Sequence, residues 1–301
     1  MAVFTVKDVQ KLREQTGVGM MDCKNALTEA DGDMEKAAEL LREKGLAAAA
    51  KKAGRIAAEG IVTAVVEGRA GAIVEVNSET DFVAKNESFR EFVTLCAKTI
   101  IEKNPEDVDA LLKCGALAGS VEDELREKIL TIGENIKIRR FERYEGVLVP
   151  YIHGGGTHAV IVRFETSDEI AQKEEFSVFG KDVAMQIAAV NPKYVDRGEV
   201  PKDETDKEME ILLAQALNEG KPQNIAEKMV QGRINKYFKD IVLLEQPFVK
   251  DDKISVSQYV SNTAKALGGD IKVTAFTRYE KGEGLEKRSD NFAEEVAGMQ
   301  K

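Results

Sequence analysis

The sequence has few of the residues that build disulfide frameworks or metal sites. It contains 3 cysteines and 2 histidines among 301 residues. Cys23, Cys96 and Cys114 lie far apart in the chain and form no Cys-x-x-Cys pair. This spacing excludes a disulfide framework and a zinc site, and we expect no cofactor.

Long apolar runs and an excess of positive charge are also lacking. No run approaches the ~18 apolar residues that a membrane span requires, and residues 1–4 do not begin a basic segment followed by an apolar one. We therefore expect a cytoplasmic protein without membrane contact. The formal net charge is −10 and the sequence pI is about 5.1. An acidic surface repels phosphate backbones, so we expect no direct binding of nucleic acid.

Signatures of common enzyme classes are missing as well. No Gly-x-x-x-x-Gly-Lys-Ser/Thr occurs, and Gly17-Val18-Gly19 continues into methionines, which excludes a P-loop and a dinucleotide fingerprint. His153-Gly154-Gly155-Gly156 is similar to the oxyanion loop of esterases, but no Gly-x-Ser-x-Gly supplies a nucleophile. The glycines favour a hairpin turn, from which His153 either acts or is simply exposed. A binding protein, not an enzyme, is the better interpretation.

An internal repeat organises most of the chain. A strand-like segment at 71–77 leads through a turn into a helical pattern that includes Phe89 and Phe92, and this arrangement returns 87 residues later at Phe176 and Phe179. The second half of the repeat returns after 135 residues, as from Ser120 to Ser255. The second copy is therefore 48 residues longer. Helical patterns interrupted near 220–222 place this insertion, a helical hairpin, at about 191–247.

These patterns predict an α+β fold. Each copy is expected to form strand, strand, helix, helix, strand, which makes a three-stranded antiparallel sheet with helices on one face. A three-helix module precedes them, with a capping box at Thr5, stops at Gly17 and Gly45, and a helical connector at 47–55. The expected domains are 1–54 for the N-terminal module and 55–145 and 146–280 for the two core subdomains.

Phe82 is the position where the repeat breaks most informatively. Asp81 recurs as Asp168, and both are expected to accept backbone N–H bonds at a helix start. Phe82 is replaced by Glu169 in the second copy, so the fold does not require an aromatic ring at this corner. The ring either inserts into a partner or packs against something present only in the first copy, and both alternatives remain open.

Met20 and Met21 are a second candidate contact. They are predicted to lie in the loop between the first two helices. Methionine at such a place either forms an adaptable contact surface or plugs a core, and we favour the contact surface.

The sequence closely resembles the elongation factor Ts family of bacteria. The resemblance is carried by residues 12–27 and 75–86 and extends over the rest of the chain, including 133–136 and 220–230. It implies a guanine nucleotide exchange factor for elongation factor Tu. It also implies an N-terminal module like a ubiquitin-associated (UBA) domain, two core subdomains and a helical coiled-coil insertion. A C-terminal helical module, also implied by the resemblance, would occupy 281–301 with a helix at 290–299.

The resemblance also implies which residues touch the partner. Asp81 and Phe82 would enter elongation factor Tu near its magnesium site. The full set of expected contacts is Arg13, Met20, Met21, Thr80, Asp81, Phe82, Val83, Ile132, Gly133 and His153. Gly154-Gly155-Gly156 departs from the family pattern beside His153. A helix-binding adaptor without exchange activity remains the alternative function, and the hairpin either binds the partner or forms a homodimer.

Overall fold

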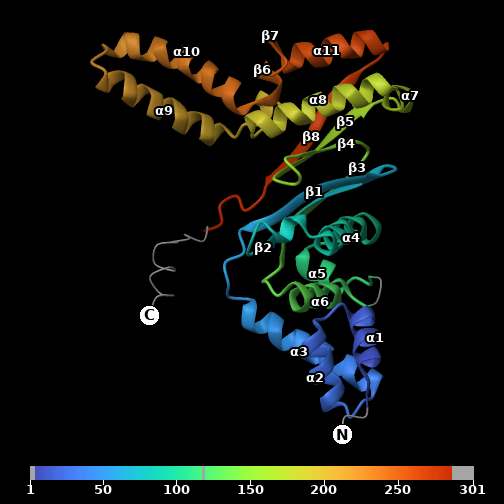
Figure 1. Cartoon of the computed structure of the whole chain (residues 1–301). Coiled ribbons are helices and arrows are strands. Elements are labelled where there is room, and N and C mark those ends of the chain that lie inside the picture. The colour runs from blue at the N-terminus through green and yellow to red at the C-terminus, as the bar shows by residue number, and fades with distance from the viewer. Residues whose placement is uncertain (1–3, 117–118, 287–301) are drawn as a thin grey trace.

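The computed structural model describes residues 4–116 and 119–286, and three helices open the chain (Figure 1). They are α1 (Val6–Thr16), α2 (Met20–Glu29) and α3 (Met34–Lys52). Thr5 and Asp8 form the predicted capping box, and Gly17 ends α1 in the left-handed conformation with φ 65°. Leu12, Cys23 and Leu27 are fully buried between the helices, so this small module has its own core.

Two predictions about this module are wrong. Gly45 does not end the third helix, because α3 continues through the alanines that follow to Lys52. Alanine has the highest helix propensity, and packing of α3 on a later helix offsets the roughly 1 kcal/mol cost of an internal glycine. Met20 and Met21 do not lie in a loop, since they form the first turn of α2.

Two three-stranded antiparallel sheets form the centre of the molecule. One has the order β1-β2-β3 and the other the order β4-β5-β8. The strands are β1 (Glu59–Glu67), β2 (Ala70–Ser78), β3 (Lys137–Glu145), β4 (Val147–His153), β5 (His158–Thr166) and β8 (Ile271–Glu280). The sheets face each other across a small apolar layer that includes Val62, Ile73 and Ile161.

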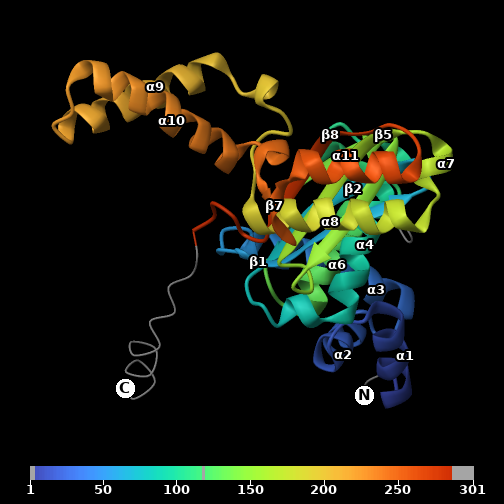
Figure 2. The same ribbon diagram turned by 90° about the horizontal axis from the view of Figure 1, so that it is seen from above.

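Helices cover the outer face of each sheet, which produces four layers (Figures 1 and 2). The first sheet carries η1 (Val83–Lys85), α4 (Glu87–Lys103), α5 (Val108–Lys113) and α6 (Val121–Ile132), and the second carries α7 (Asp168–Ala171), α8 (Glu174–Val190) and α11 (Val256–Leu267). Phe89 and Phe92 fill the core beneath α4, and Phe176 and Phe179 fill the equivalent core beneath α8. The predicted duplication and α+β class are confirmed.

The insertion projects from the second subdomain as a helical hairpin (Figure 2). It consists of η2 (Arg197–Glu199), α9 (Lys202–Asn218) and α10 (Gln223–Ile241), and the chain returns through η3 (Leu243–Glu245), β6 (Pro247–Phe248) and β7 (Asp251–Ser255). Arg278 Nε donates to the carbonyl of Ala188 at 3.3 Å, near the end of α8. Because Arg278 pairs with Val160 near the start of β5, the hairpin leaves at the same end of the sheet as the β4–β5 turn.

The sequence patterns did not predict every element. Helix α5 and the short β6–β7 pair have no counterpart in the predicted scheme. The C-terminal helix predicted at 290–299 lies outside the described residues. None of the helices that the structure describes combines the length and hydrophobicity required to cross a membrane.

Candidate functional site

Phe82 lies at the corner between β2 and α4 and points away from the core. Its side chain is 76% exposed, whereas the next residue, Val83, is 6% exposed and anchors the turn in the core of the first subdomain. The second copy follows the same pattern, because Ile170 is buried and the Glu169 side chain is 87% exposed. The exposure of Phe82 excludes the alternative in which the ring packs within its own subdomain.

Asp81 and Asp168 do not cap helices, which corrects the prediction made from their recurrence. Ser167 caps α7, and the Asp168 carboxylate instead pairs with Arg69 of the β1–β2 turn at 2.6 Å. The short helix η1 has no side-chain cap at all. Within the described part of the chain, the Asp81 carboxylate forms no hydrogen bond or ion pair. Arg69 of the β1–β2 turn corresponds to Gly156 of the β4–β5 turn. Asp81 therefore has no arginine at the position from which Arg69 pairs with Asp168.

A carboxylate from the end of α6 holds the base of this turn. Glu134 accepts hydrogen bonds from the Thr80 backbone N–H at 2.9 Å and from the Thr80 hydroxyl at 2.6 Å. Glu79 in turn accepts from the Asn135 backbone N–H at 2.6 Å and contacts the Arg55 guanidinium at 3.3 Å. These reciprocal bonds place Thr80 beside the segment that follows Ile132 and Gly133.

The Ile132–Gly133 pair ends α6 and is accessible. Gly133 adopts φ 87° and caps the helix with its N–H bonded to the carbonyl of Ile129. Ile132 is half-buried, and Gly133 is exposed. The structure therefore brings this pair and the Asp81–Phe82 corner onto one continuous edge.

The β4–β5 turn lies close to the same edge. Its glycines form the predicted hairpin turn, and an ideal Cβ on Gly156, which has φ 106°, would lie 2.5 Å from Ile61 Cγ2. The Val62 backbone N–H donates to the carbonyl of Gly156 at 2.9 Å, so this turn of the second subdomain is attached to the first. His153 is exposed, and its Nδ1 lies 3.0 Å from the Tyr151 hydroxyl.

Arg90 joins the two turns, and the sequence analysis missed it. This exposed side chain in the first turn of α4 donates from Nε to the carbonyl of Ala84 at 2.9 Å and from Nη2 to the carbonyl of Gly155 at 3.5 Å. Ala84 lies two residues after Phe82, and Gly155 lies two residues after His153. One guanidinium therefore connects the Phe82 corner to the His153 turn.

The N-terminal module presents the remaining predicted residues. Arg13 and Met20 are exposed, and Met21 is 63% exposed, which excludes a core plug at that position. An ideal Cβ on Gly17 would lie 3.6 Å from Thr131 Cγ2. The α1–α2 loop thus abuts the last turn of α6, next to Ile132.

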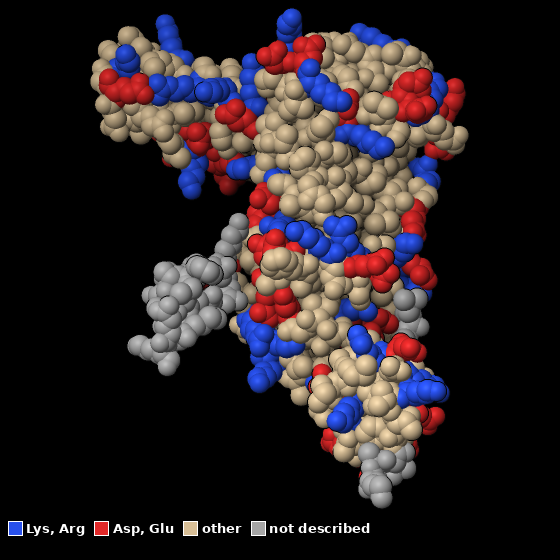
Figure 3. Space-filling model, viewed as in Figure 1, with Lys and Arg blue, Asp and Glu red and all other residues tan. Residues whose placement is uncertain are grey.

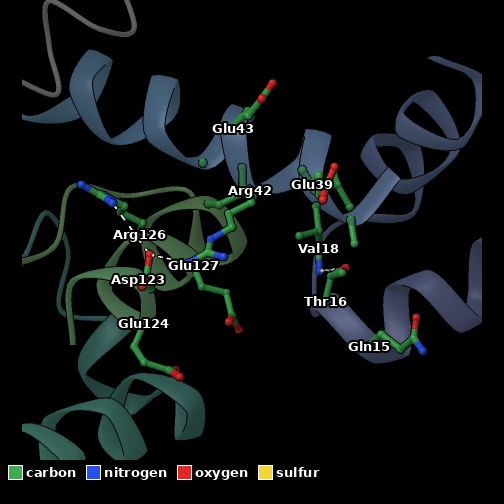
Figure 4. Close-up of a pocket in the computed structure, with 14 residues that line it drawn as sticks. Gln15, Thr16, Val18, Glu39, Arg42, Glu43, Asp123, Glu124, Arg126 and Glu127 are labelled. Atoms are coloured by element: carbon green, nitrogen blue, oxygen red, sulfur yellow. Dashed lines mark hydrogen bonds and ion pairs between the residues drawn. The ribbon is translucent and has the colours of Figure 1, made fainter. Parts of the chain in front are cut away.

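A cleft of about 460 Å³ separates α3 and the α1–α2 loop from α6, and Figure 4 shows its lining side chains. Arg42 of α3 crosses it to pair with Asp123 of α6 at 2.9 Å. The backbone N–H of Ser120, then Arg42 and the Ser120 hydroxyl, lower the pKa of Asp123 to about 2. None of the predicted partner contacts lines the cleft, which marks the joint between the N-terminal module and the core.

Charge does not single out any one region of the visible surface. On the face shown in Figure 3, lysines and arginines are interspersed with aspartates and glutamates, and no continuous basic surface is seen. The feature that distinguishes the candidate edge is therefore the exposed ring of Phe82 and not a concentration of charge. Lys85 Nζ lies 6.0 Å from the centre of that ring, at the outer limit for a cation–π contact.

Comparison with known proteins adds independent evidence. The family model described as elongation factor TS matches residues 79–283. Elongation factor Ts of Clostridioides difficile strain 630 is 52% identical over 302 residues, with 99% of each chain covered. Elongation factor Ts of Clostridium perfringens strain SM101 is 50% identical over 304 residues, and that of Syntrophotalea carbinolica is 48% identical over 303, each with 99% of both chains covered.

Proposed function

Because this chain belongs to the elongation factor Ts family, we propose that it is a guanine nucleotide exchange factor that releases GDP from elongation factor Tu during translation elongation. The observation that carries the finer part of this proposal is the corner at Asp81 and Phe82. It offers an exposed aromatic ring beside a carboxylate that has no partner among the described residues. The equivalent corner of the second copy has neither feature, since Glu169 replaces the ring and Arg69 engages Asp168.

The mechanism follows from thermodynamic linkage. A factor can promote GDP release only if it binds the empty GTPase more tightly than the loaded one, and GDP then weakens the factor's binding by the same ratio. Phe82 is proposed to act as a wedge that displaces packed elements near the magnesium site. Asp81 would disturb the groups that order the ion, whose charge holds the diphosphate. No covalent step is required.

The remaining contacts would align this wedge. Ile132, Gly133 and Glu134 flank the Phe82 corner, and the His153 turn lies on its other side. Arg13, Met20 and Met21 would extend the interface onto the N-terminal module, which packs beside α6.

The helical hairpin is proposed as a second, separate contact with the same partner. Ile211, Leu217 and Ile225 are 40–45% exposed on its surface, and a partner could cover these apolar side chains. Sedimentation of the isolated chain tests this assignment, because a stable homodimer lost on substitution of Ile211 would show that the hairpin binds a second copy instead.

The function is tested by mixing the full-length chain with elongation factor Tu that carries fluorescent GDP. We expect faster loss of fluorescent GDP in stopped-flow measurements. We also expect the two proteins to co-elute in the absence of nucleotide and to separate when GDP is added. An unchanged release rate across a range of factor concentrations would reject the proposal.

A further inference from the structure

The two copies of the repeat support each other's strand-to-helix corners by different contacts. In the second copy, the Asp168 side chain at the corner is held by Arg69, which belongs to the hairpin turn of the first copy. In the first copy, the corner is held through its backbone, because Arg90 binds the carbonyl of Ala84 and reaches the carbonyl of Gly155 in the other copy's turn. In this second arrangement, none of the residues that the structure describes engages the Asp81 side chain.

An arginine is not required at this position by the subdomain fold. The offset of 87 residues that relates Phe89 to Phe176 also relates Arg90 to Ser177. Ser177 is exposed in the first turn of α8 and supports an equally buried core at Phe176 and Phe179. The arginine and its two carbonyl contacts therefore occur only in the first of the two copies.

We propose that Arg90 is a positioning residue for nucleotide exchange, fixing the Phe82 corner and the His153 turn in one relative arrangement. This inference rests on the proposed function. A guanidinium presents several N–H donors in a rigid plane, so a single side chain can bind two carbonyls from different segments at once. Two loops ordered before binding lose less entropy when they meet a partner together.

The free protein provides the first test. Hydrogen exchange is measured in full-length wild type and Arg90→Ser, a variant that carries the residue of the second copy. The reporting amides are Lys85, which donates to Phe82, and Gly156, which donates to His153. We expect both to exchange roughly 5-fold faster in the variant, as the loss of a net hydrogen bond predicts. Unchanged exchange at both amides would overturn the positioning role.

The second test uses elongation factor Tu and fluorescent GDP. Arg90→Ser is expected to slow stimulated GDP release roughly 5-fold. Arg90→Lys should be similarly slow, because an ammonium keeps the charge but lacks the planar arrangement of donors. Full activity of Arg90→Lys would show that charge alone matters and would overturn the proposal.

Two further variants sharpen the result. Lys98→Ser removes a cation from the same helix, where Lys98 faces Glu67 at 3.5 Å, and should leave release unchanged. Arg90→Ser combined with His153→Ala should be less impaired than the product of the single effects, because each substitution disrupts the same arrangement. If the effects of the two substitutions on GDP release simply multiplied, the proposed positioning role would be contradicted. Failure of the wild-type chain to release GDP would reject the exchange function, whereas the hydrogen-exchange result would stand on its own.

Discussion

At the residue scale, Phe82 and Glu169 occupy equivalent corners of the two copies, so each serves as a reference for the other. Both side chains are largely exposed, and the neighbouring Val83 and Ile170 provide the buried anchor. Substitution of either exposed side chain should therefore leave the core unchanged.

Phe82→Ala is expected to reduce stimulated GDP release about 30-fold, the effect of losing ~2 kcal/mol at a binding hot spot. Its free energy of unfolding should change by no more than about 0.5 kcal/mol, because the ring is exposed. Stopped-flow release and urea unfolding measure the two quantities. Glu169→Ala is the matched control and should change neither; a loss of activity there would show that the corner is not specific to the first copy.

Glu75 is a residue of the opposite kind, a fully buried carboxylate. It accepts hydrogen bonds from the Gly282 backbone N–H at 2.8 Å and the Arg140 Nε at 2.7 Å, and Arg139 and Asn77 add further bonds. Burial raises the pKa of Glu75, but these donors outweigh burial and hold the pKa below its usual value. The carboxylate thereby attaches the segment after β8 to β2.

Glu75→Gln should lower the free energy of unfolding by about 3 kcal/mol, because it removes the buried counter-charge that two partly buried guanidinium groups share. Urea denaturation of the full chain measures the change. Glu142→Gln makes the same chemical replacement at an exposed position of β3 and should be close to neutral. Equal stability of the two variants would show that the buried carboxylate contributes little.

At the element scale, Glu204 links three segments at the root of the helical hairpin. Glu204 of α9 accepts from the Tyr194 hydroxyl at 2.6 Å and from the Tyr237 hydroxyl at 2.7 Å. These tyrosines lower the pKa of Glu204 to about 2. The bonds connect α9 to α10 and to the segment that follows α8, so they set the direction in which the hairpin projects.

Glu204→Ala should loosen the hairpin without unfolding the core. Amides of α9 and α10 are expected to exchange about 10-fold faster, since hydrogen bonds to a charged group contribute roughly 1.5 kcal/mol or more. Hydrogen exchange followed by mass spectrometry separates these peptides from those of α8. Glu210→Ala removes an exposed carboxylate from the same helix and provides the comparison; equal exchange in the two variants would argue against a role for Glu204.

At the scale of the whole molecule, the Arg42–Asp123 pair joins the N-terminal module to the core. The folded-state pKa of Asp123 is depressed to about 2. Its contribution to stability is therefore present above the unfolded pKa of ~4 and is lost as the pH falls through the folded pKa.

The stability difference between wild type and Asp123→Asn tests this linkage. The wild type should be more stable by a constant amount above pH ~5, and the difference should shrink between pH ~4 and ~2. Thermal unfolding over this pH range measures it. A difference that is undiminished at pH 2 would mean that the carboxylate's charge is not the source of the stabilisation.

Much of this molecule could be predicted because its signals are local. Capping boxes at Thr5 and Ser120 and the recurrence of Phe89 as Phe176 identified helices and the duplication. Contacts between the copies could not be predicted. Arg90 and Gly155 are 65 residues apart, and a lone arginine on a helix carries no pattern. Comparing Arg90 with Ser177, its equivalent in the second copy, could have identified the arginine. Comparing Phe82 with Glu169 identified Phe82 in this way.

The pairing of Arg69 with Asp168 has a consequence for engineering. The equivalent corner at the opposite end of the sheet pair has its carboxylate, Asp168, paired with Arg69, and Glu169 stands in place of the aromatic ring. Combining Arg69→Gly with Glu169→Phe would remove the partner of Asp168 and add an exposed ring beside it, as at the Asp81–Phe82 corner. If the Asp81–Phe82 corner is the partner contact proposed above, the doubly substituted chain should present two such contacts and bind two copies of the partner.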